Sequence, residues 1–303
     1  MASLIRVLPR IARALDDGDP VVALESSVFA QGLPCPENAE AARAMVDAVE
    51  RAGAVPGITA VVRGVPSVGL EPDELDRFLG RDGIRKVSAR DLATAVATGA
   101  DGATTVAASI ALASAVGIQV FATGGIGGVH RDAPYDESAD LGELARTPML
   151  VVCAGAKSIL DLEATWERLE TLGVTVIGYR TSELPGFYTA NTGIRLDTRV
   201  DDARDIAAIW RAHKGLGRRQ SIVVVQEPPK THRLSRETVE AAVAEARVAA
   251  QRNAVRGAAV TPFLLSEVSR LTNGGSLVAN VALLRENAAL AGAVAKEIAI
   301  ELH

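Results

Sequence analysis

One lysine stands where a nucleophile could work, in the stretch VVCAGAKSILD at residues 151–161. Lysine is scarce in this chain, with five copies among 32 basic residues, and Lys157 follows a short apolar run and a turn of small residues. Arginine keeps its proton in proteins, whereas a neutral lysine can attack a carbonyl carbon. The spacing therefore indicates either a nucleophile or a lysine that anchors a phosphate group, and the two interpretations are equally good.

The surroundings of Lys157 favour the neutral amine. A helix is predicted to begin at about Ser158, and the positive end of its dipole disfavours an ammonium group nearby. Partial burial would have the same effect, and Lys86, at the mouth of another predicted strand, would add repulsion between like charges.

Acidic residues supply candidate proton donors and metal ligands. Glu25 ends the apolar stretch VVALE, where a carboxyl group either accepts hydrogen bonds or, in a pocket, carries a proton and acts as an acid. In DESAD, Asp136 and Asp140 lie four residues apart around Ser138, a pattern typical of a helix N-terminus that also suits a hard cation. His130 alone is more typical of a hydrogen-bonded loop residue than of a catalyst.

The glycine-rich stretch ATGGIGGVHR fits neither common nucleotide-binding pattern. Counted from Gly125, the dinucleotide pattern requires a glycine where His130 stands, and a phosphate loop ending in AKS requires a glycine where Val151 stands. We expect instead that backbone amides of this loop approach an anionic ligand.

Apolar strands alternate with helices along the chain, which predicts an α/β fold. We expect a single domain over residues 1–303 with three α/β/α layers, in which a mainly parallel or mixed central sheet carries helices on both faces. Helices are predicted over residues 3–16 and, at the end of the chain, over about 234–252, 262–272 and 276–300. Sites in such sheets lie beyond the carboxyl ends of the strands, which selects four loops: 25–27, 86–88, 123–130 and 154–158.

The composition is typical of a soluble globular protein, since 48% of the 303 residues are hydrophobic and 23% are charged. The formal net charge of −5 indicates no basic face, so nucleic acid is not an expected partner. Apolar runs are too short, or too interrupted by glycine and charges, to suggest a membrane span. Cys35 and Cys153 lie far apart in the chain, and we expect a cytoplasmic protein without disulfides.

Long stretches of the chain match a known family in order and over almost its whole length. The stretches are VALESSVFAQGLPCPEN, KVSARDLA, ATTVAASIALA, VFATGGIGGVHR, SADLGELART, VVCAGAKSILD, VIGYRTSELPGFY, VTPFLLSEVSRLT and SLVANVALLRENA. In them the sequence resembles the pseudouridine-5'-phosphate glycosidases, also called indigoidine synthase A-like proteins.

The resemblance implies reversible cleavage of pseudouridine 5'-phosphate into uracil and ribose 5-phosphate by a homotrimer that uses a divalent metal, usually manganese. It implies that Lys157 is the nucleophile, that Glu25 donates a proton and that Asp136 binds the metal. Further residues are implied to contact the substrate or face the pocket: Lys86, Val106, Ser138, Ala139, Asp140, His130 and Asn280.

The chain departs from the family pattern at four positions. Gln31 stands where histidine is common, Cys35 where an aromatic residue is common, Ala103 where glycine is frequent, and Glu137 where an apolar residue is usual. These departures bear on base selectivity and leave Glu25 and Lys157 in place. Two other functions fit the same residues: a Schiff-base lyase or aldolase acting on another phosphorylated sugar, and a non-catalytic subunit that binds a sugar phosphate.

Overall fold

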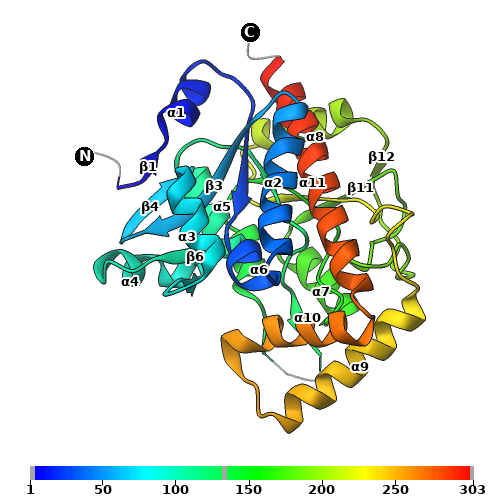
Figure 1. Ribbon diagram of the computed structural model, residues 1–303. Helices are drawn as coiled ribbons and strands as arrows, with labels where there is room; N and C mark the ends of the chain where they lie inside the picture. Colours follow the sequence, from blue (N-terminus) through cyan, green and yellow to red (C-terminus); the bar gives the residue numbers. More distant parts are fainter. Residues whose placement is uncertain (1–3, 132–134, 301–303) are drawn as a thin grey trace.

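A central sheet runs through the computed structural model, which describes residues 4–131 and 135–300 (Figure 1). Its eleven strands are β1 (Arg6–Val7), β2 (Val21–Glu25), β3 (Val55–Val62), β4 (Val65–Val68), β5 (Arg85–Val87), β6 (Gly102–Thr104), β7 (Val120–Ala122), β9 (Leu150–Cys153), β11 (Thr175–Tyr179), β12 (Arg199–Val200) and β13 (Ile222–Val225). They follow the order β1-β4-β3-β2-β7-β9-β13-β11-β12, and β6 joins β5 to β3. All pairs from β3 to β12 along this order are parallel, whereas β4 and β6 run antiparallel to β3.

Helices cover both faces of this sheet, which confirms the predicted three-layer α/β/α fold (Figure 1). On one face α2 (Glu37–Arg51), α8 (Ala203–Gly215) and α11 (Gly275–Ala299) pack side by side. On the other face α5 (Val106–Ala115) packs against β2 and β3 and against α6 (Ala139–Leu144). The remaining helices are α1 (Pro9–Asp16), α3 (Pro72–Gly80), α4 (Leu92–Ala97), α7 (Leu162–Thr171), α9 (Arg236–Arg252) and α10 (Val260–Leu271), with short helical turns η1 (Val28–Gly32), η2 (Ala89–Asp91) and η3 (Gly257–Ala259).

The middle strands are apolar, apart from Glu25 at the end of β2, because both of their faces are covered. Every residue of β2, β9 and β13 is buried, as expected for parallel strands between two helical layers. Aromatic residues are only 3% of the chain, and valine, alanine, leucine and isoleucine supply most of the core. Small side chains also let α5, which is buried almost all round, lie close to the sheet.

The three predicted C-terminal helices are confirmed as α9, α10 and α11, whereas the prediction for residues 3–16 is wrong in its first half. Residue 3 lies outside the described residues, and Arg6–Val7 form β1, which pairs with β4. The helix begins only at Pro9, because proline has the backbone angle of a helix but suits only the first turn, where no amide hydrogen is needed.

Helix α11 corrects a second prediction from the sequence, that no segment is long and apolar enough to span a membrane. Its 25 residues are long and apolar enough by length and composition alone. However, 61% of its most apolar window is buried inside the protein, where it packs on α2, on α8 and on the middle of the sheet. A central core helix of an α/β fold has the same character.

Candidate active site

The loops after the parallel strands β2, β7 and β9 converge at the carboxyl edge of the sheet, as predicted, and line a cavity of about 410 Å³. The end of β5 reaches the same cavity although this strand runs antiparallel to the other three. We call this cavity the main chamber. A smaller inner chamber of about 50 Å³ adjoins it, and Glu25, Lys86 and Lys157 line both. The other predicted residues also line a chamber: Val106, His130, Asp136, Ser138, Ala139 and Asp140 the main one, and Asn280 the inner one.

Glu25 is the last residue of β2, and only 3% of its surface is exposed. The Ser27 hydroxyl donates to its Oε2 at 2.6 Å, and the Thr123 hydroxyl donates to its Oε1. A buried carboxyl group needs such partners, and here they also fix its orientation towards the chambers. Because a hydroxyl can donate or accept, the same pair suits either protonation state of Glu25.

Lys157 lies in the loop after β9, where its backbone N–H donates to the carbonyl of Ile126 at 3.1 Å. The side chain is half-buried, and its ammonium group forms no hydrogen bond or ion pair with any residue in the described ranges. A lysine that faces a chamber without a partner is available to a ligand.

The prediction of a helix beginning next to Lys157, at about Ser158, is wrong. Leu160 pairs with His130 in a small two-stranded sheet of β8 (Val129–His130) and β10 (Leu160–Asp161). Helix α7 begins after Asp161, whose carboxylate accepts a hydrogen bond from the Ala164 N–H at 2.9 Å. Because the helix dipole acts over about one turn, α7 begins too far along the chain to disfavour an ammonium group at Lys157 in the way that the sequence predicts.

Lys86 and Lys157 lie close enough to repel one another. The pKa of Lys86 is below its ordinary value, mainly because packed protein removes hydration from its ammonium group and also because Lys157 carries a like charge. The nearby carboxylates of Asp140 and Glu25 partly oppose this shift. Lys86 keeps accessible surface because it faces the main chamber, and this surface leaves it free to meet a ligand.

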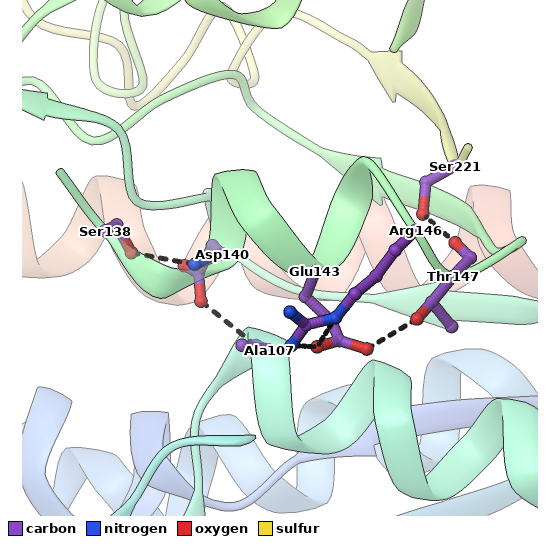
Figure 2. Close-up of polar contacts among 7 residues, drawn as sticks. All are labelled: Ala107, Ser138, Asp140, Glu143, Arg146, Thr147 and Ser221. Carbon is purple, nitrogen blue, oxygen red and sulfur yellow. Dashed lines mark hydrogen bonds and ion pairs between the residues drawn. The ribbon is translucent and has the colours of Figure 1, made fainter. Parts of the chain in front are cut away.

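Asp140 ties two walls of the main chamber together. Its Oδ1 accepts from the N–H of Ala107 at 3.0 Å and its Oδ2 from the N–H of Gly127 at 2.8 Å, so it joins the start of α5 to the glycine loop. Figure 2 shows Asp140 in the first turn of α6, pointing towards Ala107, with Ser138 capping its backbone N–H. The carboxylate predicted to contact substrate is therefore already bound to the backbone.

The next turn of α6 anchors the helix itself. The buried carboxylate of Glu143 accepts hydrogen bonds from Arg146 and Thr147, and Ser221 donates to the backbone of Thr147 at 2.7 Å (Figure 2). These contacts fix α6, and with it the position of Asp140, against the neighbouring strand β13.

Asp136, by contrast, is exposed, and its carboxylate has no hydrogen-bond or ion-pair partner in the part of the chain that the structure describes. The neighbouring Glu137 is held by Arg168 at 3.0 Å. Among residues 4–131 and 135–300, no group of three or more His, Cys, Asp or Glu side chains is placed to hold a metal ion. This donor set suits a hard cation that binds one carboxylate and keeps most of its water, and does not suit a closed protein cage.

The main chamber also receives the N-terminal end of α5. Val106 is the first residue of this helix, and the hydroxyl of Thr105 before it is buried without a partner among the described residues. The N–H of Ala107 already donates to Asp140, so the donors that can attract an anion here are the hydroxyl of Thr105 and the other N–H groups of the first turn.

Close approach requires glycine at two positions of the glycine loop. A Cβ on Gly125 would lie 2.7 Å from the ring of Phe187 and 2.8 Å from the carbonyl of Gly155. A Cβ on Gly127 would collide with Ser138 and Asp140. The glycines thus let this loop pack against its neighbours. The sequence pattern alone could not predict which residues those neighbours are.

Sequence reasoning missed several residues of the site. Ser27 and Thr123 orient Glu25, and Asn287 of α11 donates to the carbonyl of Thr123 at 2.8 Å. Helix α10 closes both chambers through Thr261, which no local pattern could have placed there. Of the positions that depart from the family pattern, Gln31 lines the inner chamber, whereas the exposed Cys35 lines neither chamber.

The fold and the site define a three-layer α/β protein with a buried carboxyl group and two lysines in a cavity at the carboxyl edge of its sheet. A family model described as indigoidine synthase A like protein matches residues 10–297. The chain belongs to this family.

Relatives and solved structures agree with this assignment. A pseudouridine-5'-phosphate glycosidase of Gemmatimonas aurantiaca is 59% identical over 96% of this chain and 95% of its own length. Another, of Herpetosiphon aurantiacus, is 51% identical over 97% and 98%. The crystal structure of the prealnumycin C-glycosynthase AlnA in complex with ribulose 5-phosphate superposes with a TM-score of 0.91 at 38% identity, covering 100% of this chain and 99% of the other. An indigoidine synthase A-like protein of Thermotoga maritima gives 0.90 at 34% identity, covering 97% and 96%.

Proposed function

We propose that this protein is a pseudouridine-5'-phosphate glycosidase, which reversibly cleaves the carbon–carbon bond between ribose and uracil. The observation that carries the proposal is the placement of Glu25, Lys157 and Lys86 around the same two chambers. The full-length relatives that bear this name support the choice of substrate.

The reaction needs an electron route, because the atom that leaves the sugar is carbon and has no lone pair to protonate. In our proposal the neutral amine of Lys157 attacks the anomeric carbon as the bond from that carbon to the ring oxygen breaks. Glu25 gives its proton to the ring oxygen, and the nitrogen loses a proton to water, which leaves an open-chain amine adduct.

Breakdown of the adduct releases the two products. The lone pair of the Lys157 nitrogen forms an iminium as the bond to uracil breaks, and the uracil ring carbon takes up a proton. Water then adds to the iminium carbon, and loss of the amine frees ribose 5-phosphate and restores Lys157. General acid catalysis of the kind assigned to Glu25 typically contributes about 10²–10⁴-fold to the rate.

The phosphate group would lie in the main chamber near Lys86 and the start of α5. Lys86 supplies positive charge, Val106 a helix N-terminus, and Thr105 a hydroxyl without a partner among the described residues, while Ser138 and Ala139 line the same chamber. Asp140, in this proposal, acts by holding these walls together. His130 and Asn280 border the sugar and the base from the main and inner chambers.

A divalent cation, manganese on the family resemblance, would be held by Asp136. When bound, it would supply a positive charge that polarises a substrate oxygen or water. The carboxylate supports this assignment because it is exposed and has no partner among residues 4–131 and 135–300. Omission and addition of manganese in an assay of uracil release would test it directly.

The covalent step is tested by borohydride reduction of the protein with ribose 5-phosphate, followed by peptide mass mapping. We expect one adduct, on Lys157. Reduction on another lysine, or none, contradicts the scheme. In Lys157→Arg, which keeps the charge, we expect no measurable uracil release; near-normal turnover would leave only a phosphate-anchoring role.

The same experiments separate the other two functions. A lyase or aldolase for another phosphorylated sugar would form the Lys157 adduct yet release no uracil from pseudouridine 5'-phosphate. A non-catalytic subunit would bind ribose 5-phosphate without forming the adduct.

We also propose a cytoplasmic homotrimer. The trimer follows from the family resemblance, and the cytoplasm is supported by two cysteines that form no disulfide, Cys35 exposed and Cys153 buried. Light scattering of the purified protein would measure the mass, with three times 31.5 kDa expected.

A further inference from the structure

A third cavity, of about 500 Å³, adjoins the inner chamber and has no part in the reaction described above. We call it the side cavity. It lies between η1, helix α10 and the start of α11, and Gln31 and Asn280 line both it and the inner chamber. A ligand in the side cavity would therefore touch the wall of the chamber that holds the base.

Arg81 lines the side cavity and has an unused binding edge. Its Nε and Nη2 atoms are buried, and neither has a hydrogen-bond partner in the described residues. These two nitrogens form one edge of the guanidinium group, the edge that meets both oxygens of a carboxylate in parallel hydrogen bonds. Leaving the buried donors of a charged group without a partner is unfavourable in free energy, so an anion bound at this edge would be stabilising.

Gln31 adds an unused acceptor. Its Nε2 donates to the carbonyl of Ile84 at 3.3 Å, and this bond fixes which way the amide points. The opposite atom, Oε1, is buried and has no partner within the described part of the chain, and the same holds for Oδ1 of Asn280. Both oxygens require an N–H or O–H donor, which a bare anion does not supply.

The remaining walls are suited to a flat ring. Leu33, Pro34, Tyr188 and Leu265 also line the side cavity. Apolar and aromatic walls with a few directional polar groups are typical of small-molecule sites.

We propose that the side cavity binds a small cyclic carboxylate, whose carboxylate meets the Nε–Nη2 edge of Arg81 and whose ring N–H meets Gln31. The site extends the proposed function, because it shares Gln31 and Asn280 with the inner chamber. Recognition by Arg81 does not depend on that reaction.

Calorimetric titration of the full-length protein, without sugar phosphate, tests the proposal with two probes. Orotate carries ring N–H groups and a carboxylate, and uracil is the same ring without the carboxylate. We expect orotate to bind at least about tenfold more tightly, the advantage of hydrogen bonds to a charged group.

Variants assign that advantage to the guanidinium edge. Arg81→Gln and Arg81→Lys should both abolish it, because lysine keeps the charge but has no planar edge. Arg270→Gln is the matched control: this arginine also lines the side cavity, but Glu267 already holds it at 2.9 Å, and the advantage should persist. Circular dichroism verifies folding, and Arg81→Lys decides the matter if Arg81→Gln does not fold.

The proposal is overturned if the wild type binds the two probes equally, or if the orotate advantage survives in both Arg81 variants. Water would then be the partner of the Nε–Nη2 edge of Arg81. Failure of the wild type to release uracil from pseudouridine 5'-phosphate would overturn the proposed function and would leave Arg81-dependent orotate binding standing.

Discussion

The two aspartates of the DESAD stretch should respond in opposite ways to the same substitution. Asp140 is 5% exposed and accepts two backbone hydrogen bonds, whereas Asp136 is exposed and has no partner in the described chain. In Asp140→Asn one oxygen remains as an acceptor, and the new amide turns an N–H towards the other backbone N–H. We therefore expect a loss of stability in Asp140→Asn and none in Asp136→Asn.

The size of the loss follows from the two bonds. A hydrogen bond to a charged group contributes about 1.5–3 kcal/mol, and roughly half of that when both partners are neutral. In Asp140→Asn one bond is lost and the other is weakened, so the free energy of unfolding should fall by about 2–4 kcal/mol at most.

Urea unfolding followed by circular dichroism measures the difference. A chelator should be present, so that metal bound at Asp136 does not add stability to the wild type. Asp136→Asn should stay within about 0.5 kcal/mol of the wild type, as is usual for exposed substitutions. Equal losses in the two variants, or a loss below about 0.5 kcal/mol in Asp140→Asn, would refute the assignment of Asp140 as the tie between α5 and the glycine loop.

Three further substitutions test other parts of the site. The pKa of Lys86 is lowered, so this lysine loses the charge that binds phosphate at a lower pH than an ordinary lysine does. KM for a phosphorylated substrate should therefore increase with pH in the wild type and stay level in Lys86→Arg. Level profiles in both proteins would contradict this role. Gly125→Ala should cost about 1–3 kcal/mol and reduce uracil release, whereas Gly142→Ala, where a Cβ meets open space, should not destabilise; similar urea midpoints for both would show that the loop can give way. Asn287→Leu should cost about 1–3 kcal/mol, because the carbonyl of Thr123 loses its buried donor, and an unchanged midpoint would mean that water replaces it.

Lys86 shows how far electrostatic reasoning from the sequence could go. From the sequence we expect Lys86 to repel Lys157 if the two lie close. Lys86 lies in β5, which runs antiparallel to the central strands because it pairs with β6, so a shared strand direction does not explain their meeting. The structure brings them together, and Lys157 contributes to the lowered pKa of Lys86. The helix expected beside Lys157 failed because Asp161, not Ser158, caps α7, and the pairing of Leu160 with His130 is a contact between distant segments.

The sequence by itself determined the layers of this fold, since fully apolar strands separated by helices must be covered on both faces. It also determined that the loops after β2, β7 and β9 form the site, because these parallel strands place their carboxyl ends at one edge. The antiparallel β5, which carries Lys86, reaches the site for a reason that strand direction does not supply. Only the tertiary structure decided what each polar group does there. Asp136 and Asp140 look alike in sequence, yet Asp140 is bound to the backbone, whereas Asp136 is exposed and meets no partner in the segments that the structure describes. The physical reason is that hydrogen-bond partners such as Ala107, and the walls that exclude water, come from distant segments that local patterns do not record.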